Sequence, residues 1–451
     1  MFKRWLAVLA LLVLIISCSD KSTSYDNRSL REKLEAIPGA TVVQKQDMSG
    51  MAVYQIDLLQ PVDHNNPNGP QFSQRFYLTH RSETAPMVLA LSGYDCTGNY
   101  IYGESGILQA NQIYVGHRLM VGAKIDPVDY SVMNMEQASA DYHHIVEVLK
   151  PIYTGKWMSF GASKGGMTAL FHKRFYPSDV DAVLTRVAPL PTQPEDPRFN
   201  AFFTEKIATP ECRARMEQFQ REALLHKEEL IPMINSFINS SSDTYPLDAE
   251  TMLEYAVLEY PFSFWQYGSG NCEQIPGSGS SVSAIYYALN SVVGFDYYSQ
   301  EEMDKYYPAY YHMLTECGYY GFVTDHISDL LTTDDHYSND IFAPSGVDLT
   351  FNAGVMPSVI SWLQNQGDHI IYIYGANDPW GAAAIELNGS ASALKIVQPG
   401  ENHNVQLSDL DDIQEVYDSL ESWLDVPVYP QAAPVMMKTA PEDQPHRPGL
   451  F

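Results

Sequence analysis

Short apolar runs alternate along the chain with longer stretches in which apolar residues recur at helical spacing. Met87–Leu91 is apolar throughout, as expected for a strand that a parallel sheet buries on both faces. Between residues 135 and 149, the apolar residues fall on one face of a helix. Strands that alternate with helices predict an α/β fold with a mostly parallel sheet. Further strands are predicted at residues 51–58 and 74–80, as a hairpin-like pair, and at 113–121, 180–187, 369–374 and 394–397.

This alternation stops between residues 191 and 345 and returns after them. The interval holds helix-like segments at 212–230 and 249–260, a Gly/Ser-rich loop at 268–283 and a tyrosine-dense segment at 297–311. We interpret it as a helical cap inserted into the sheet domain. The predicted organisation is a signal peptide over residues 1–18, a tether over 19–40 with one short helix at 29–36, and the core over 41–190. The cap over 191–345, the rest of the core over 346–425 and a proline-rich tail over 426–451 follow.

The composition supports a large folded protein and argues against nucleic acid as a partner. The chain has 451 residues, of which 45% are hydrophobic, and this length predicts two or three domain-sized units. Its formal charge is −28, from 55 acidic and 27 basic residues. Such a surface repels nucleic acid and anionic lipid headgroups, so we expect no nucleic-acid partner.

The first residues have the pattern of an export signal. Lys3 and Arg4 precede an apolar run over residues 5–16, which is short for a membrane-spanning helix. Ile15-Ile16-Ser17-Cys18 resembles a bacterial lipobox, in which the cysteine is lipidated and becomes the mature N-terminus. We therefore expect an exported protein of the cell envelope that contacts the membrane through its lipid at Cys18. An ordinary cleaved signal or an uncleaved anchor are the alternatives.

Four cysteines remain after Cys18: Cys96, Cys212, Cys272 and Cys317. Export to an oxidising compartment favours one or two disulfides, and four cysteines allow three full pairings. The sequence contains no CxxC pair and no HExxH motif, so it predicts no metal site, and it calls for no cofactor.

A strand, a sharp turn and a helix are predicted around Ser163. Apolar and aromatic residues lead into Gly161-Ala162-Ser163-Lys164-Gly165, and a helix-compatible run follows. This is the pattern of a nucleophile elbow, whose crowded backbone requires small residues beside the serine. The backbone amide of Lys164 is then placed to stabilise an oxyanion. The loop after Met87–Leu91 offers a second amide, which we assign to Tyr94.

Two further residues complete a candidate triad. Asp378 and His403 each follow a predicted strand, and the order Ser…Asp…His is that of α/β-hydrolases. Because strand ends meet at one edge of a parallel sheet, the three side chains are expected to gather there. His403 would take the proton of Ser163, and Asp378 would hold the imidazole in the required tautomer.

At these residues the sequence resembles the S37 peptidases, secreted bacterial tripeptidyl aminopeptidases of the prolyl-peptidase-like serine clan. The most specific element is Gly-x-Ser-Lys-Gly-Gly-Met-Thr at residues 161–168. The resemblance implies Ser163, Asp378 and His403 as the triad and a helical cap over an α/β-hydrolase core. Further similar residues are Asn111 and Gln112, His117 and Arg118, Gln137 and Ala138 with Asp141, Leu149 and Lys150, and Lys156 and Trp157.

The function expected from these features is that of a lipid-anchored serine exopeptidase that releases short peptides, chiefly tripeptides, from free N-termini. Such an enzyme must recognise a charged α-amino group, with a pKa of about 8, which a carboxylate in the cap or in the loop after Tyr94 can bind. Glu104, Glu205 and Glu273 are the candidates. An esterase or lipase with the same triad is one alternative, and a non-catalytic binding lipoprotein on a hydrolase scaffold is another.

Overall fold

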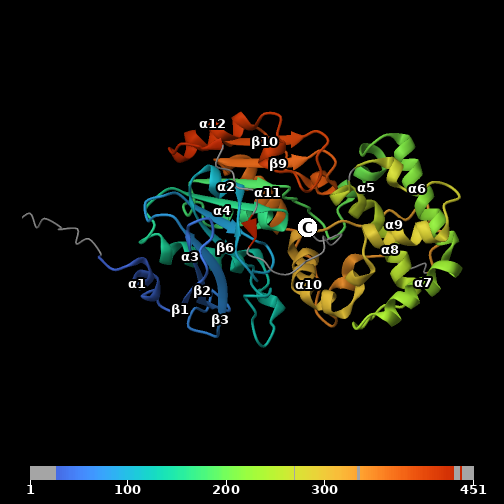
Figure 1. Ribbon diagram of the computed structural model, residues 1–451, viewed down its shortest axis with the longest axis horizontal. Coiled ribbons are helices and arrows are strands. Elements are labelled where there is room, and N and C mark those ends of the chain that lie inside the picture. The colour runs from blue at the N-terminus through green and yellow to red at the C-terminus, as the bar shows by residue number, and fades with distance from the viewer. Residues whose placement is uncertain (1–26, 269, 333–335, 431–436, 439–451) are drawn as a thin grey trace, which may run out of the picture.

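The core of the protein is a nine-stranded sheet in the order β1-β2-β3-β6-β4-β7-β8-β9-β10 (Figure 1). The structure is a computed structural model that describes residues 27–268, 270–332, 336–430 and 437–438. The strands of the sheet are β1 (Ala40–Gln44), β2 (Ala52–Pro61), β3 (Gln71–His80), β4 (Met87–Leu91), β6 (Asn111–Val115), β7 (Trp157–Ala162), β8 (Ala182–Arg186), β9 (Ile370–Gly375) and β10 (Ala393–Gln398).

The direction of the strands confirms the predicted fold class. All pairs from β6 to β10 across the sheet are parallel, whereas β1, β2 and β3 pair antiparallel with their neighbours. The predicted pair at 51–58 and 74–80 is therefore present as β2 and β3. The sheet is mostly parallel and mixed, as in an α/β-hydrolase core.

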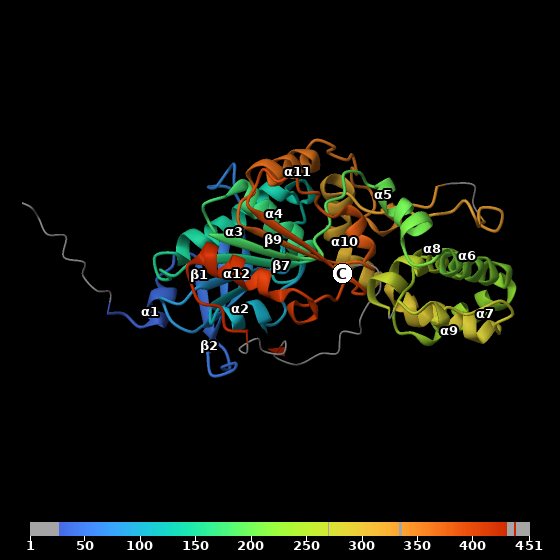
Figure 2. The same cartoon turned by 90° about the horizontal axis from the view of Figure 1, so that it is seen from above.

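Helices cover both faces of this sheet because its strands alternate side chains between two apolar layers. Along β4, Met87, Leu89 and Leu91 pack in one layer, and Val88 and Ala90 pack in the other. The first layer contains the helices α1, α3, α4 and α11, and the second contains α2 and α12. Figure 2 shows α3, α4 and α11 on one side of the sheet and α2 and α12 on the opposite side. Their bounds are α1 (Leu30–Glu35), α2 (Gly103–Ile107), α3 (Met135–Leu149), α4 (Lys164–Phe175), α11 (Val355–Gln366) and α12 (Ile413–Leu424).

A separate helical body forms the cap, which enters the chain between β8 and β9 (Figure 1). Its central helix α8 is buried along most of its length, so apolar residues surround it on all sides. π-helical turns extend two of the cap helices at Phe202–Lys206 and Met313–Cys317. The cap helices are α5 (Pro197–Ala201), α6 (Pro210–Leu225), α7 (Lys227–Ser240), α8 (Ala249–Tyr267), α9 (Val282–Val292) and α10 (Gln300–His312).

The strand predicted at 113–121 is shorter than expected and begins earlier, as β6. The chain leaves the sheet after Val115 because the next side chains enter buried polar contacts. The guanidinium of Arg118 is fully buried and pairs with Asp141, with Nη2 2.8 Å from Oδ1. Leu119, the next residue, has a φ of 67°, which is incompatible with the extended backbone of a strand.

Residues near both chain ends pack on or pair with the core where the structure describes them. Leu34 of α1 is buried in the core, so residues predicted as a tether contribute to packing. Near the other end, β11 (Met437–Lys438) pairs antiparallel with β5 (Tyr100–Ile101). The predicted signal peptide and Cys18 lie outside the described residues.

Two of the cysteines form a disulfide in the cap. Cys212 and Cys272 are bonded across a separation of 60 residues, which joins the start of α6 to the loop after α8. Cys96 and Cys317 are buried as free thiols.

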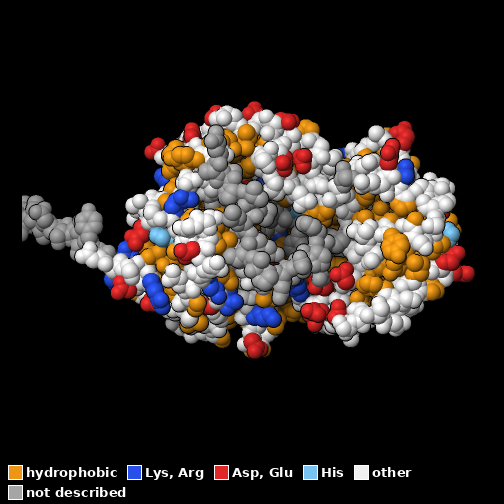
Figure 3. Space-filling model, in the orientation of Figure 1, with side chains coloured by type: hydrophobic (Ala, Val, Ile, Leu, Met, Phe, Trp, Pro, Cys, Tyr) orange, Lys and Arg blue, Asp and Glu red, His pale blue; other side chains and the backbone are white. Residues whose placement is uncertain are grey.

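The surface retains the acidic character of the sequence. Acidic side chains occur over both the core and the cap on the face shown in Figure 3. Within the described ranges, no helix combines the length and apolar character that crossing a membrane would require.

Candidate active site

Ser163 occupies a strained turn between β7 and α4. Its backbone has φ 53° and ψ −127°, a conformation that few residues other than glycine adopt. Its N–H donates to the carbonyl of Arg186 on β8, and its own carbonyl accepts from Met167 on α4. A Cβ on Gly161 would lie 2.2 Å from the carbonyl oxygen of Gly165, so the turn requires glycine there. The predicted nucleophile elbow is therefore present, with Ser163 half-buried at its apex.

Asp378 and His403 form a buried pair at the same edge of the sheet. Asp378 follows β9 and is fully buried, and its Oδ2 lies 2.7 Å from Nδ1 of His403, which follows β10. The other carboxylate oxygen of Asp378 accepts from the N–H of Trp380 at 3.0 Å. These contacts fix the imidazole ring and leave Nε2 as its reactive nitrogen.

Nε2 of His403 is buried and has no hydrogen-bond partner in the described part of the chain. Within the described residues, Ser163 therefore makes no hydrogen bond to this nitrogen. The cap lies directly over the histidine, since the backbone N–H of His403 donates to the carbonyl of Gln266 at the end of α8. The rings of Tyr267 and Trp380 lie 5.9 and 6.4 Å from the imidazole.

The predicted oxyanion loop lies against the elbow. A Cβ on Gly165 would lie 2.3 Å from the carbonyl oxygen of Leu91, so the two backbones are in contact. The amides of Lys164 and Tyr94 thus belong to neighbouring segments. The N–H of Tyr94 donates in this structure to Oγ of Ser92, at 3.0 Å.

The side chain of Lys164 joins these two segments. It is buried, its Nζ donates to the carbonyl of Gly93 at 3.0 Å, and the same nitrogen lies 5.5 Å from the centre of the Tyr94 ring. Burial lowers the pKa of Lys164 to about 8, an effect that nearby Cys317 and Glu316 oppose. Burial also raises the pKa of Glu316 to about 7. The sequence predicts a role for the backbone amide of Lys164, and the structure shows that its side chain also belongs to the site.

Of the three acids proposed to bind a substrate amine, Glu104 already has a cationic partner. It is buried on α2, and its Oε1 lies 3.1 Å from Nε of Arg186 at the end of β8. The same guanidinium donates from Nη1 to the carbonyl of Val405, two residues after His403. Glu104 therefore helps to hold the histidine loop through Arg186.

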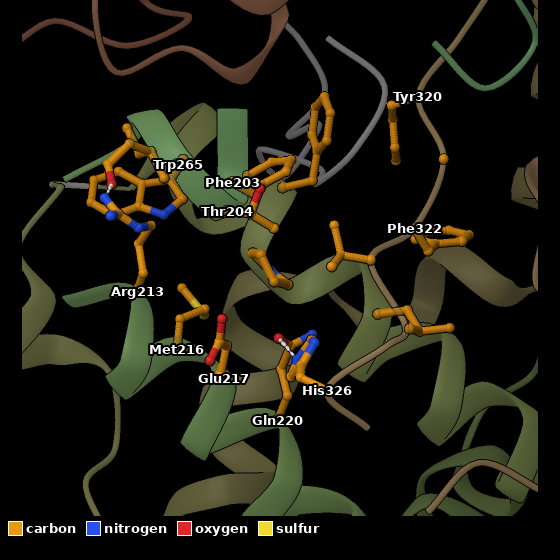
Figure 4. Close-up of a pocket in the computed structure, with 16 residues that line it drawn as sticks. Phe203, Thr204, Arg213, Met216, Glu217, Gln220, Trp265, Tyr320, Phe322 and His326 are labelled. Carbon is orange, nitrogen blue, oxygen red and sulfur yellow. Dashed lines mark hydrogen bonds between the residues drawn. The ribbon is translucent and has the colours of Figure 1, made fainter. Parts of the chain in front are cut away.

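Glu205 and Glu273 lie on the surface of the cap. Both are exposed, Glu205 beside the wide cap pocket of Figure 4 and Glu273 beside the disulfide. The structure does not bring the three acids together. The pocket in Figure 4 is lined mainly by apolar side chains, among them Phe203, Met216 and Trp265.

Sequence reasoning missed a buried carboxyl group in the cap, that of Glu259 on α8. It is 8% exposed and accepts hydrogen bonds from two hydroxyl groups. The sequence feature that points to this residue is an acid between Leu258 and Tyr260, in an otherwise apolar part of the helix. Within the described ranges, no group of three or more His, Cys, Asp or Glu side chains is placed to hold a metal ion.

Comparison with known proteins yields one family and one close relative. The family described as PS-10 peptidase S37 matches residues 25–433. The prolyl tri/tetrapeptidyl aminopeptidase of Streptomyces mobaraensis is 30% identical over 389 residues, which cover 84% of this chain and 81% of that protein.

Solved structures with some similarity include two bacterial proteins. The proline iminopeptidase of Mycobacterium smegmatis has 12% identity and a TM-score of 0.40, covering 81% of this chain and 98% of its own. Cfl2 of Burkholderia cenocepacia has 11% identity and a TM-score of 0.37, covering 85% of this chain and 100% of its own.

Replacing Lys164 by Met should impair turnover more than substrate binding. The variant keeps the backbone amide but leaves the carbonyl of Gly93 without its donor, so the oxyanion loop is held less firmly. We expect kcat on a peptide anilide to fall about 10- to 100-fold, with KM within about threefold of wild type.

The matched control is Lys173→Met, on the same helix. Lys173 is also buried and donates to two carbonyl groups, those of Pro177 and Val180, away from the triad. The Lys173→Met variant should be less stable than wild type but should keep the wild-type kcat. Equal loss of kcat in both variants would contradict a positioning role for Lys164.

Proposed function

Because this chain belongs to the PS-10 peptidase S37 family and is a serine peptidase, we propose that it is an exported exopeptidase that releases short peptides, chiefly tripeptides, from free N-termini. The observation that carries the catalytic part of the proposal is the buried Asp378–His403 pair beside a strained serine elbow. The name of the Streptomyces relative supports peptides of three or four residues that end in proline.

The triad residues would act in two steps. In the first, Nε2 of His403 accepts the proton of Ser163 while Oγ attacks the carbonyl carbon, and the imidazolium then protonates the leaving amine. In the second, water attacks the acyl-enzyme with His403 as the base, and Ser163 recovers its proton. Asp378 stabilises the imidazolium in both steps, and the amides of Lys164 and Tyr94 are the proposed donors to the oxyanion.

The cap supports an exopeptidase rather than an endopeptidase. Its helix α8 ends against His403, and the Trp380 ring, next to the triad, packs on Phe262 of the same helix at 5.0 Å. A cap helix in this position would hinder a folded chain from reaching the triad more than it would hinder a free chain end. Recognition of that end requires a group that binds an ammonium.

Replacing Ser163 by Ala should abolish turnover and labelling by a fluorophosphonate probe. The thermal midpoint should stay close to that of wild type, because a half-buried serine makes few packing contacts. A residual rate on the order of 10³-fold over water is compatible with the proposal. Wild-type turnover in the variant would refute the triad, and a folded wild-type protein that takes no label would favour the binding-lipoprotein alternative.

Acetylating the N-terminus of a substrate should strongly reduce its turnover by the wild-type protein. We expect kcat/KM for N-acetyl-Ala-Ala-Pro 4-nitroanilide to be about 30- to several-thousand-fold below that of the free peptide, because a charge-assisted contact is lost. Equal values for the two substrates would favour an esterase or an endopeptidase over an aminopeptidase. The rate on a matched ester substrate would then distinguish the esterase from the endopeptidase.

We further propose attachment to the cell envelope through a lipid at Cys18, on the basis of the lipobox-like sequence. The variant Cys18→Ser should move from the detergent phase to the aqueous phase, or remain unprocessed, when detergent extracts of cells are partitioned. Partitioning equal to that of wild type would show that the lipobox interpretation is wrong.

A further inference from the structure

The carboxyl group of Glu259 lacks a cationic partner in the described part of the chain. It accepts hydrogen bonds from the hydroxyl of Tyr320 at 2.7 Å and from Oγ of Ser263 at 2.8 Å. Each carboxylate oxygen accepts one of these two hydrogen bonds, so each oxygen can accept one more. Glu254, buried on the same helix, is different because it pairs with Lys227. An ionised carboxylate that is buried without a cation is costly, so such a group either takes up a proton or pairs with a cationic ligand.

Aromatic rings surround this carboxyl group. Five tyrosines and two phenylalanines, together with Glu259 and Asn339, line a small cavity in the cap. The space has about the size of one water molecule or one ammonium group. Tyr320 and Phe322 also line the wide pocket of Figure 4. A carboxylate among aromatic faces is a typical receptor for an organic cation, which gains from both the charge and the π-systems.

The ionisation of Glu259 is consistent with such a receptor. Burial raises the pKa of this carboxyl group to about 7, while the hydrogen bonds from Tyr320 and Ser263 oppose that shift. A bound cation would favour the ionised form and lower this pKa again.

The cavity lies a short distance from the proposed oxyanion loop. The ring of Tyr306 on α10 lies 6.3 Å from the ring of Tyr94. Tyr310, one turn further along α10, lines the cavity, and one turn corresponds to about 6 Å. On the other side, Trp380 contacts both the ring of His403, at 6.4 Å, and the ring of Tyr320, at 5.5 Å. An extended tripeptide spans about 10 Å, which is comparable with these separations.

We propose that Glu259, within its tyrosine-lined cavity, binds the α-ammonium group of the peptide substrate. This assignment rests on the proposed aminopeptidase function, and it replaces Glu104, Glu205 and Glu273 as the candidate anchor. The carboxylate pairs with the ammonium, and neighbouring rings such as those of Tyr310 and Tyr320 shield the pair from water. The distance from this anchor to Ser163 then selects the length of the peptide released.

The test compares free and N-acetylated Ala-Ala-Pro 4-nitroanilide with the variants Glu259→Gln and Glu254→Gln. Glu259→Gln keeps the size of the side chain and removes its charge. It should reduce kcat/KM for the free peptide about 30-fold or more and change that for the acetylated peptide by less than about threefold. Glu254→Gln, which removes a paired carboxylate from the same helix, should keep the wild-type preference for the free peptide.

The outcomes separate this inference from the proposed function. If the wild-type protein does not prefer the free peptide, the aminopeptidase proposal fails. If wild type prefers it and folded Glu259→Gln prefers it equally, the assignment of Glu259 is wrong. Should Glu259→Gln not fold, Tyr320→Phe takes its place, since it removes one hydroxyl donor to the carboxylate. This variant should lower the preference about three- to tenfold, and an unchanged preference in the folded variant would overturn the inference.

Discussion

The active site depends on the contact between two backbones, that of the serine elbow and that of the loop after β4. The carbonyl oxygen of Leu91 approaches Gly165 so closely that no side chain fits between them. This contact brings the segment that carries the amide of Lys164 next to the one that carries the amide of Tyr94. The ammonium of Lys164 also donates a hydrogen bond to the carbonyl of Gly93, which links the two segments a second time. The strained backbone of Ser163 persists because these neighbours hold it on both sides.

Buried charges in this protein fall into two groups, according to whether the chain supplies a partner. Arg118 pairs with Asp141, Arg186 with Glu104 and Lys227 with Glu254, and each pair ties together distant segments. Removing one member of such a pair leaves the other uncompensated, so these residues maintain the structure. Glu259 belongs to the second group, because it receives hydroxyl donors but no cation from the described chain. The presence or absence of a cationic partner thus distinguishes a carboxylate that stabilises the fold from one that is available to a ligand.

The sequence predicted the elements that depend on local pattern and missed those that depend on distant partners. The elbow, the parallel strands and the loops carrying Asp378 and His403 follow from apolar runs and turn residues close to them in sequence. The strand predicted at 113–121 ended early, since Arg118 meets an aspartate on α3 that no local pattern reveals. The sequence does not reveal the partner of Glu104, because Arg186 lies on β8, far away along the chain. Glu259 was overlooked since an apolar helix suggests packing alone, and its donor Tyr320 comes from a separate segment of the cap.

An anchor based on charge would fix the length of the released peptide less strictly than an anchor based on a hydrogen bond. Peptides of three and four residues differ by about 3.3 Å when extended, which is more than a hydrogen bond can absorb. The attraction between an ammonium and a carboxylate in a poorly solvated cavity falls more gradually with distance than a hydrogen bond does. An enzyme that measures length with Glu259 and its tyrosines would thus require a free amino group strictly and the number of residues less strictly.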